Sequence, residues 1–252
     1  MNNVTLSNIK QQASIFYELA MTVLDWLNYI NRISKGQDIL DESSFKYPIT
    51  EYLERKKDAF CGLELNHPIF KRKKVDVVWR YANNSSSIKS EQEWEYFMEL
   101  KYASNTDVQR IFDDLCRLYY IKKKYNSSRC YFLICGEKEL FVTNFQNKII
   151  QSQKSIKQEV EEKEYKGNNQ PPYSKWFTLQ PSNPTKIIEC ESNNKYYRSF
   201  LTREKGKYIF YNPQDKIDKI RFQTRLLERR TNANSHKEFC IAIWEIELVD
   251  CE

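Results

Sequence analysis

The sequence of 252 residues contains few glycines and histidines, and this scarcity excludes several kinds of functional site. It has five glycines and neither a GxGxxG nor a GxxxxGK[S/T] pattern, so no glycine-rich loop is available to bind a nucleotide phosphate. It has two histidines, His67 and His236. A histidine-based metal centre is therefore not expected, and nothing near either residue indicates a Ser-His-Asp or Cys-His site.

Paired cysteines and long apolar segments are also lacking. The seven cysteines are odd in number and form no CxxC motif, and several lie within apolar runs. We expect reduced core residues in a cytoplasmic protein, with neither disulfides nor a zinc site. The first ten residues are polar and no apolar run is long enough for a membrane span, so neither a signal peptide nor membrane association is predicted. The net charge of +6 is compatible with a polyanionic partner but does not establish one.

A clear apolar stripe occupies residues 8–30. Apolar residues recur there every three or four positions, at Ile9, Ala13, Phe16, Ala20, Val23, Leu27 and Ile30. This spacing predicts an amphipathic helix. Its three heptads are at the lower limit for a coiled coil, so packing on its own domain is favoured, and a homodimer through this helix is the alternative.

Residues 47–136 alternate between helical and strand patterns. Pro48 favours the start of a helix, because the first turn does not need its missing N–H group. Thr106 and Gln109 resemble a capping box at the start of a second helix, whose apolar spacing continues to Ile121. Strands are predicted at 62–65, 75–81, 94–102, 130–135 and 140–144. Up to residue 136 the order is helix, three strands, helix, strand.

The chain after residue 147 is less regular. Residues 148–166 are polar and charged, and a turn-rich GNNQPP segment follows. Short aromatic-rich strands are predicted at 176–179, 186–189, 196–201, 207–211, 220–226 and 239–248. We therefore expect an α/β protein with a helical segment at 1–45, a core at 46–147 and a β-rich part at 148–252. The last part is either a subdomain or an extension of the first sheet.

Charged residues within the predicted strands are the strongest functional signal. Asp76 lies among valines in KKVDVVW, and Glu99 and Lys101 lie on one face of the next strand. A buried carboxylate is costly unless it is paired or bound to a cation. Two adjacent strands can bring Asp76 and Glu99 together, and oxygen-only ligation suits Mg²⁺ or Mn²⁺. A metal beside Lys101 is suited to activating water for phosphodiester hydrolysis.

Asp76 followed by Glu99-Leu100-Lys101 and preceded by an acidic helix resembles the PD-(D/E)xK nuclease superfamily. The predicted αβββαβ order is similar to that superfamily's core, so the resemblance implies a restriction-endonuclease-like fold with a mixed sheet over residues 47–136. It implies that Asp76 and Glu99 bind Mg²⁺, with Mn²⁺ as a substitute, and that Lys101 is the catalytic lysine. Val75 stands where the superfamily's name has proline.

The same resemblance assigns roles to residues outside the strands. Glu51 on the first helix of the core would complete the metal site, with Glu54 as a less favoured substitute. Gln109 resembles the polar residue that some members place against the substrate phosphate. The alternatives for the strands are that Glu99 and Lys101 form a surface ion pair, and that Asp76 accepts hydrogen bonds from backbone N–H groups at a strand end.

Basic runs supply candidate DNA contacts. Lys73 and Lys74 directly precede the strand that carries Asp76, and Arg229 and Arg230 lie in TRLLERRTNANSHK. The leading expectation is a Mg²⁺-dependent endonuclease that hydrolyses DNA, similar to restriction or phage-defence enzymes, which are typically homodimers. A non-catalytic nucleic-acid-binding or assembly protein with a nuclease-like fold, or a nuclease directed at RNA, is the alternative.

Overall fold

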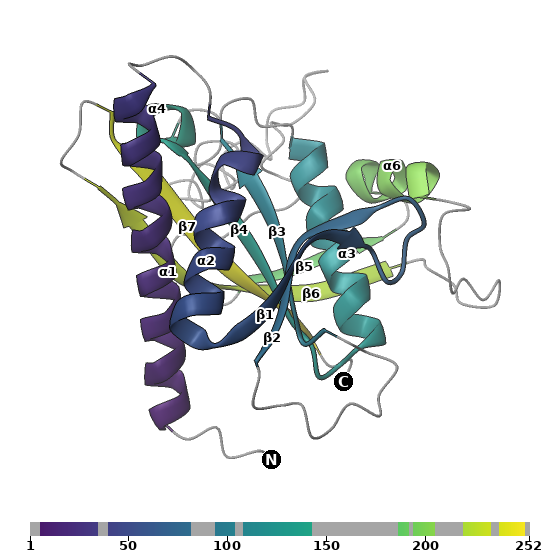
Figure 1. The fold of residues 1–252 in the computed structure, drawn as a ribbon. Coiled ribbons are helices and arrows are strands. Elements are labelled where there is room, and N and C mark those ends of the chain that lie inside the picture. Colours follow the sequence, from purple (N-terminus) through teal and green to yellow (C-terminus); the bar gives the residue numbers. More distant parts are fainter. Residues whose placement is uncertain are drawn as a thin grey trace.

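A mixed seven-stranded sheet forms the centre of the protein (Figure 1). The computed structural model describes residues 6–34, 40–81, 94–103, 108–142, 186–191, 194–204, 219–232 and 237–249. Its strands are β1 (Ala59–Asn66), β2 (Lys74–Tyr81), β3 (Tyr96–Tyr102), β4 (Arg129–Glu137), β5 (Lys186–Glu191), β6 (Lys219–Thr231) and β7 (Phe239–Leu248). They lie in the order β1-β2-β3-β4-β7-β6-β5. The β3–β4 pair is parallel, and the other described pairs are antiparallel.

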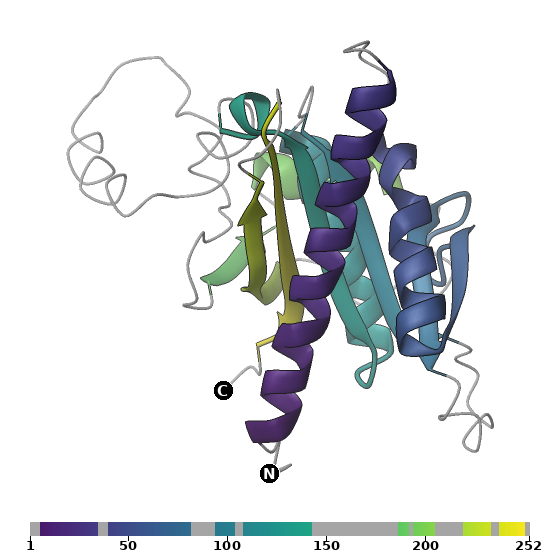
Figure 2. The same ribbon diagram turned by 60° about the vertical axis from the view of Figure 1, so that its left-hand side comes forward.

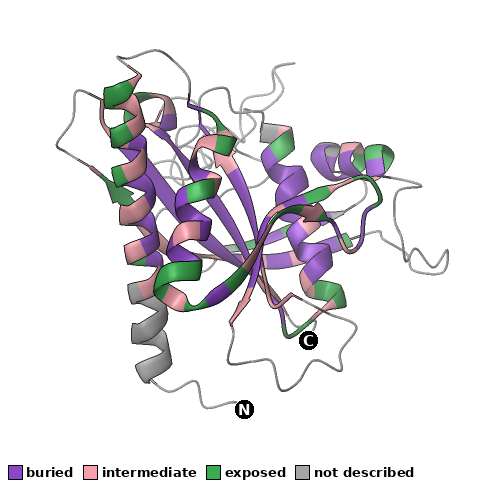
Figure 3. Ribbon diagram, in the orientation of Figure 1, coloured by how far each residue is buried: buried purple, intermediate pink, exposed green. Residues whose placement is uncertain are grey.

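Helices cover both faces of this sheet (Figures 1 and 2). They are α1 (Leu6–Ile33), the short 3₁₀ helix η1 (Glu42–Phe45), α2 (Lys46–Lys57), α3 (Val108–Lys124), the single turn α4 (Lys138–Leu140) and α6 (Lys195–Glu204). One buried apolar cluster joins α1 and α2 to one face, and another joins α3 and α6 to the opposite face. Strand β4 lies between the two layers, which explains why its apolar run is buried on both sides (Figure 3).

The predicted amphipathic helix is confirmed as α1. Four residues of the predicted stripe, Phe16, Ala20, Val23 and Leu27, are fully or almost fully buried, and Leu19 and Leu24 beside them are buried as well. They pack in the same cluster as residues of α2, β4 and β7. The helix therefore uses its apolar face within its own chain.

The predicted order of elements from the first core helix to the fourth strand is confirmed as α2-β1-β2-β3-α3-β4. Residues 140–144 were expected to form a strand, which is wrong for the described part: a helical turn follows β4 there and buries Phe141. None of the helices in the described residues combines the length and apolar content that a membrane span requires.

The expected strand at 196–201 is also wrong, because these residues belong to helix α6. The side chain of Asn194 accepts hydrogen bonds from the backbone N–H groups of Tyr196 and Tyr197, at 3.0 and 3.2 Å. This cap starts a helix, and Tyr196, Tyr197 and Phe200 then fall on its buried face despite their preference for strands. The strands expected at 176–179 and 207–211 lie outside the described residues.

The C-terminal strands extend the first sheet. Strand β7 pairs with β4 along eight residues of each strand, from Cys130↔Ile246 to Glu137↔Phe239. Strands β6 and β5 then add to the outer side of β7. Of the two arrangements open from the sequence, these strands adopt the sheet extension, while the proposed boundary at residue 147 stays a prediction.

The central position of β4 gives a stability prediction. Leu133 on β4 is fully buried, whereas Leu63 on the edge strand β1 is 43% exposed. We expect Leu133→Ala to lower the free energy of unfolding by about 2–5 kcal/mol, because it leaves a cavity between packed layers. Leu63→Ala is the control and should cost less than about 1 kcal/mol. Urea unfolding followed by circular dichroism measures both, and equal losses would contradict the described packing.

Candidate active site

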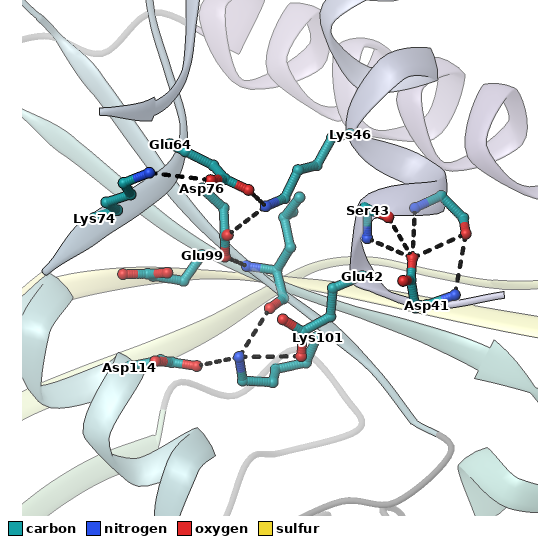
Figure 4. A network of polar contacts seen from close by, with 12 residues as sticks. Asp41, Glu42, Ser43, Lys46, Glu64, Lys74, Asp76, Glu99, Lys101 and Asp114 are labelled. Atoms are coloured by element: carbon teal, nitrogen blue, oxygen red, sulfur yellow. Dashed lines mark hydrogen bonds and ion pairs between the residues drawn. The ribbon is translucent and has the colours of Figure 1, made fainter. Parts of the chain in front are cut away.

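The carboxyl group of Asp76 lies where strands β2 and β3 stop pairing. Their ladder ends at Val77↔Met98, and continuing that register would place Asp76 opposite Glu99. In place of a backbone acceptor from β2, Oδ2 of Asp76 accepts the hydrogen bond from the backbone N–H of Leu100, at 2.9 Å (Figure 4). The two strands thus remain joined at this point through a carboxylate, and the predicted meeting of Asp76 and Glu99 is formed.

The carboxyl group of Glu99 is buried, with 3% of the residue exposed. Its Oε1 atom has no hydrogen-bond partner among the described residues, although Nε of Arg117 lies 3.6 Å away in an ion pair. Burial raises the pKa of Glu99 to about 8, and the positive charge of Arg117 limits this rise. The charge of Asp76 and a hydrogen bond to it raise the pKa further. Without a bound cation, Glu99 is therefore mostly protonated at neutral pH.

The ammonium group of Lys101 is held on the same face of β3 as Glu99. Its Nζ atom lies 2.9 Å from Oδ2 of Asp114 on α3 and 3.2 Å from Oε1 of Glu42 on η1 (Figure 4). It also donates a hydrogen bond to the backbone oxygen of Leu100, at 3.2 Å. Asp114 is 1% exposed and also forms an ion pair with Arg117. Three groups thus fix the position of Lys101 beside the two carboxylates.

A second lysine, Lys46 at the start of α2, contacts the carboxylate oxygen of Asp76 that does not accept the N–H group of Leu100. Its Nζ atom lies 3.0 Å from Oδ1 of Asp76 and 2.8 Å from Oε1 of Glu64 on β1 (Figure 4). Glu64 falls between Leu63↔Val77 and Leu65↔Val75 in the β1–β2 register, which places it opposite Asp76. Its backbone is left-handed, with φ of 49°. Carboxylates from three neighbouring strands therefore lie in one row across the sheet.

Charge partners set the protonation of this row. Burial alone would lower the pKa of Lys46, but the hydrogen bond to Glu64 and the charge of Asp76 outweigh burial and raise it. Hydrogen bonds from Lys46 and from Lys74, whose Nζ lies 3.3 Å from Oε2 of Glu64, lower the pKa of Glu64. Lys46 therefore stays protonated and Glu64 stays ionised at neutral pH.

The structure does not bring Glu51 to this site. Glu51 forms an ion pair with Arg55 one turn further along α2, at 2.6 Å. It lies five positions after Lys46 in the sequence, which places it about 140° around the helix from the lysine that does reach Asp76. The alternative, Glu54, is exposed. From this part of the chain, Glu42 and Lys46 contact the site residues instead.

The sequence interpretation missed Glu42, Lys46, Asp114 and Arg117. Two of them carried a readable signal: Asp114 and Arg117 are charged residues on the buried side of α3, next to Leu115 and Leu118. A charged side chain at such a position needs a partner in the core. Glu42 and Lys46 carried no comparable signal, because only the path of the chain from α1 to α2 brings them to the strands.

The expected phosphate contact, Gln109, faces another part of the molecule. Its Nε2 atom donates hydrogen bonds to Oδ1 of Asp113, at 2.8 Å, and to the backbone oxygen of Tyr196, at 3.1 Å. Arg203 of α6 forms an ion pair with the same carboxylate. These contacts join α3 to α6, and no described contact joins Gln109 to Asp76 or Glu99.

The expected DNA contacts lie in different places. Lys73 forms an ion pair with the buried Glu204 of α6, at 3.0 Å, and Lys74 contacts Glu64. Arg229 and Arg230 lie on β6, which β4 and β7 separate from β3. Arg230 forms an ion pair with Glu228, and its guanidinium lies 4.7 Å from the ring centroid of Tyr17. These two arginines are therefore not part of the cluster around Asp76.

The donor set around Asp76 suits a hard cation held by two carboxylates. Asp76 and Glu99 are close enough to share a hydrogen bond, and Oε1 of Glu99 is buried without a hydrogen-bond partner in the described residues. Within the described ranges, no group of three or more His, Cys, Asp or Glu side chains is arranged to hold a metal ion. The three-carboxylate set that includes Glu51 is thus not formed.

Comparison of the chain with family models, with curated proteins and with solved structures found no match, so the functional argument rests on this geometry.

The raised pKa of Glu99 predicts an unusual dependence of stability on pH. Below about pH 4.5 the group is protonated in both the folded and the unfolded chain. As the pH rises to about 8, the unfolded chain loses this proton first, so the free energy of unfolding falls. Glu99→Gln keeps the shape of the neutral side chain and should remove this loss of stability. The metal-free variant should therefore be more stable than the wild type by about 3–5 kcal/mol at high pH.

Thermal unfolding in a chelator between pH 4 and pH 9 tests this expectation. Glu189 is the control, because its ion pair with Lys219 lowers its pKa. Glu189→Gln should therefore remove stability at neutral pH, the opposite sign to Glu99→Gln. A Glu99→Gln profile parallel to that of the wild type would show that Glu99 is ionised in the folded protein at neutral pH.

Proposed function

We propose that the protein is a divalent-metal-dependent endonuclease of the PD-(D/E)xK type that hydrolyses DNA. The observation that carries this proposal is the position of three side chains: Asp76 and Glu99 adjoin each other on neighbouring strands, and Lys101 lies on the same face of β3. The order α2-β1-β2-β3-α3-β4 agrees with the αβββαβ order of restriction-endonuclease-like cores. The parallel pairing of β3 with β4 gives the mixed sheet that such a core requires.

The carboxylates and the lysine of the site would have different roles. Asp76 and Glu99 would hold Mg²⁺ or Mn²⁺, which lowers the pKa of bound water and neutralises charge on a phosphate. Glu99 must lose its proton to act as a ligand, so at neutral pH this carboxyl group releases a proton when the cation binds. Lys101, fixed by Asp114 and Glu42, would orient the attacking water and stabilise negative charge that develops on the phosphate.

Cleavage of supercoiled plasmid DNA in Mg²⁺ tests the assignment. We expect Lys101→Ala and Asp76→Asn each to lower the cleavage rate by about 100-fold or more, because one removes the charge beside the phosphate and the other a metal ligand. Lys138→Ala and Glu51→Gln are matched controls, since both side chains form ion pairs away from the site, and they should retain wild-type rates.

Equal cleavage by the wild type, Lys101→Ala and Asp76→Asn would contradict the proposal. Salt-dependent retention of DNA with no cleavage by the wild type in Mg²⁺ or Mn²⁺ would support the non-catalytic alternative. Faster hydrolysis of RNA than of DNA would assign the same site to an RNA-directed nuclease.

Two exposed cations on the β1–β2 connection are suited to contact the DNA backbone. Lys71 and Arg72 form the turn that follows Phe70, and the structure describes no ion pair for either of them. The residues before the turn are anchored in the protein: Phe70 is 1% exposed, and Nδ1 of His67 accepts hydrogen bonds from the backbone N–H groups of Ile69 and Phe70, at 3.0 and 3.1 Å. We therefore transfer the expected phosphate contact from Lys73 and Lys74, which are in ion pairs, to Lys71 and Arg72.

The salt dependence of DNA binding tests this transfer. Replacing Lys71 and Arg72 with glutamine should reduce the slope of log affinity against log salt by about 1 for each lost phosphate contact. Fluorescence anisotropy with a labelled duplex in Ca²⁺ at several salt concentrations gives the slope. The paired replacement of Arg229 and Arg230 is the control and should leave it unchanged. A smaller slope in the Arg229 and Arg230 variant, with an unchanged slope in the Lys71 and Arg72 variant, would instead support the DNA contact by Arg229 and Arg230 that the sequence predicts.

A further inference from the structure

The ammonium group of Lys46 lies at a place where a positive charge is needed in the absence of metal. It contacts one oxygen of Asp76 and one of Glu64, at 3.0 and 2.8 Å, and its side chain is 12% exposed. The other oxygen of Asp76 accepts the N–H group of Leu100 (Figure 4). In the described residues, Lys46 is the cation that forms an ion pair with Asp76.

Glu64 does not need Lys46 in the same way. Its second oxygen contacts Lys74, and half of its side chain is exposed to water. Asp76 has a side-chain exposure of 17% and lies against Glu99, so its charge is screened less well by solvent. Loss of the Lys46 contact would therefore affect Asp76 more than Glu64.

We propose that Lys46 is an internal competitor of the divalent cation. This inference rests on the proposed function, because it takes Asp76 to be a metal ligand. The ammonium neutralises Asp76 in the metal-free protein, and it leaves Asp76 when the cation binds, since two positive charges at one carboxylate repel each other. A lysine is suited to this exchange, because its compact charge is carried on a flexible stem with rotatable bonds. The site consequently binds the metal more weakly than it would without Lys46.

A purely structural lysine predicts the opposite result from a competitor. If Lys46 only stabilised the site, its removal would leave Mn²⁺ affinity unchanged or lower it, through disorder of α2 and β2. If Lys46 competes with the metal, its removal makes Mn²⁺ bind more tightly while the metal-free protein becomes less stable. The two roles thus differ in the sign of a measured affinity.

Titration of Mn²⁺ into the full-length protein, followed by calorimetry and by the electron paramagnetic resonance of free Mn²⁺, gives that sign. We expect Lys46→Met to raise Mn²⁺ affinity by about tenfold or more, because one unit of repulsive charge is removed next to the ligand. Lys46→Arg keeps the charge and should not raise it. Lys74→Met is the matched control: among the described residues this lysine forms an ion pair with Glu64 and not with Asp76, so its effect should be smaller.

Labelling of lysines in the wild-type protein gives a second test that does not depend on a variant that folds. Lys46 should react faster with an amine-specific reagent in saturating Mg²⁺ than in a chelator, as read by mass spectrometry, whereas Lys138 should react equally in both.

The outcomes separate the two proposals. The role of Lys46 is overturned if the wild type and Lys46→Met bind Mn²⁺ with equal affinity and the labelling of Lys46 does not change. If Asp76→Asn also fails to bind Mn²⁺, the proposed metal site stands. Absence of Mn²⁺ binding in the wild type and in Lys46→Met overturns both proposals.

Discussion

The hydrogen bond from the backbone N–H of Leu100 to the carboxylate of Asp76 determines how the strands of this protein form a site. Leu100 is fully buried, so its backbone N–H group needs an acceptor within the protein where the β2–β3 ladder has ended. Asp76 supplies it and fixes its own carboxylate beside Glu99. The surrounding charges then follow: Lys46 neutralises Asp76, Arg117 lies near Glu99, and Lys101 is held by groups on two helices.

The sequence predicted the elements whose burial imposes a regular pattern. Helix α1 is predictable because the period of its apolar residues matches the face that packs, and strand β4 because a continuous apolar run matches burial on both faces. Helix α6 was missed because its aromatic residues favour strands, and the cap from Asn194 decides the local structure. The sequence does not decide the joining of β7 to β4, since pairing between residues so far apart in the chain leaves no local signal.

The candidate site was predictable to the extent that it lies on strands. Asp76, Glu99 and Lys101 could be found because charged residues inside apolar strands need an explanation, and alternation placed two of them on one face. Its closeness to the start of the helix favours Glu51 as a ligand, but Glu51 forms an ion pair with Arg55. The rotation of α2 about its axis, which presents Lys46 to the sheet, is set by packing and cannot be read from spacing.

The central claim is that Asp76 and Glu99 together hold a divalent cation. Anomalous diffraction from crystals of the wild-type protein grown with Mn²⁺ tests it most directly, because the anomalous signal locates the ion without reference to activity. The account predicts a Mn²⁺ peak within ligand distance of both carboxylates, about 2.0–2.3 Å from an oxygen of each. Ordered crystals with the Mn²⁺ peak elsewhere, or with no peak beside the two carboxylates at saturating Mn²⁺, would contradict it.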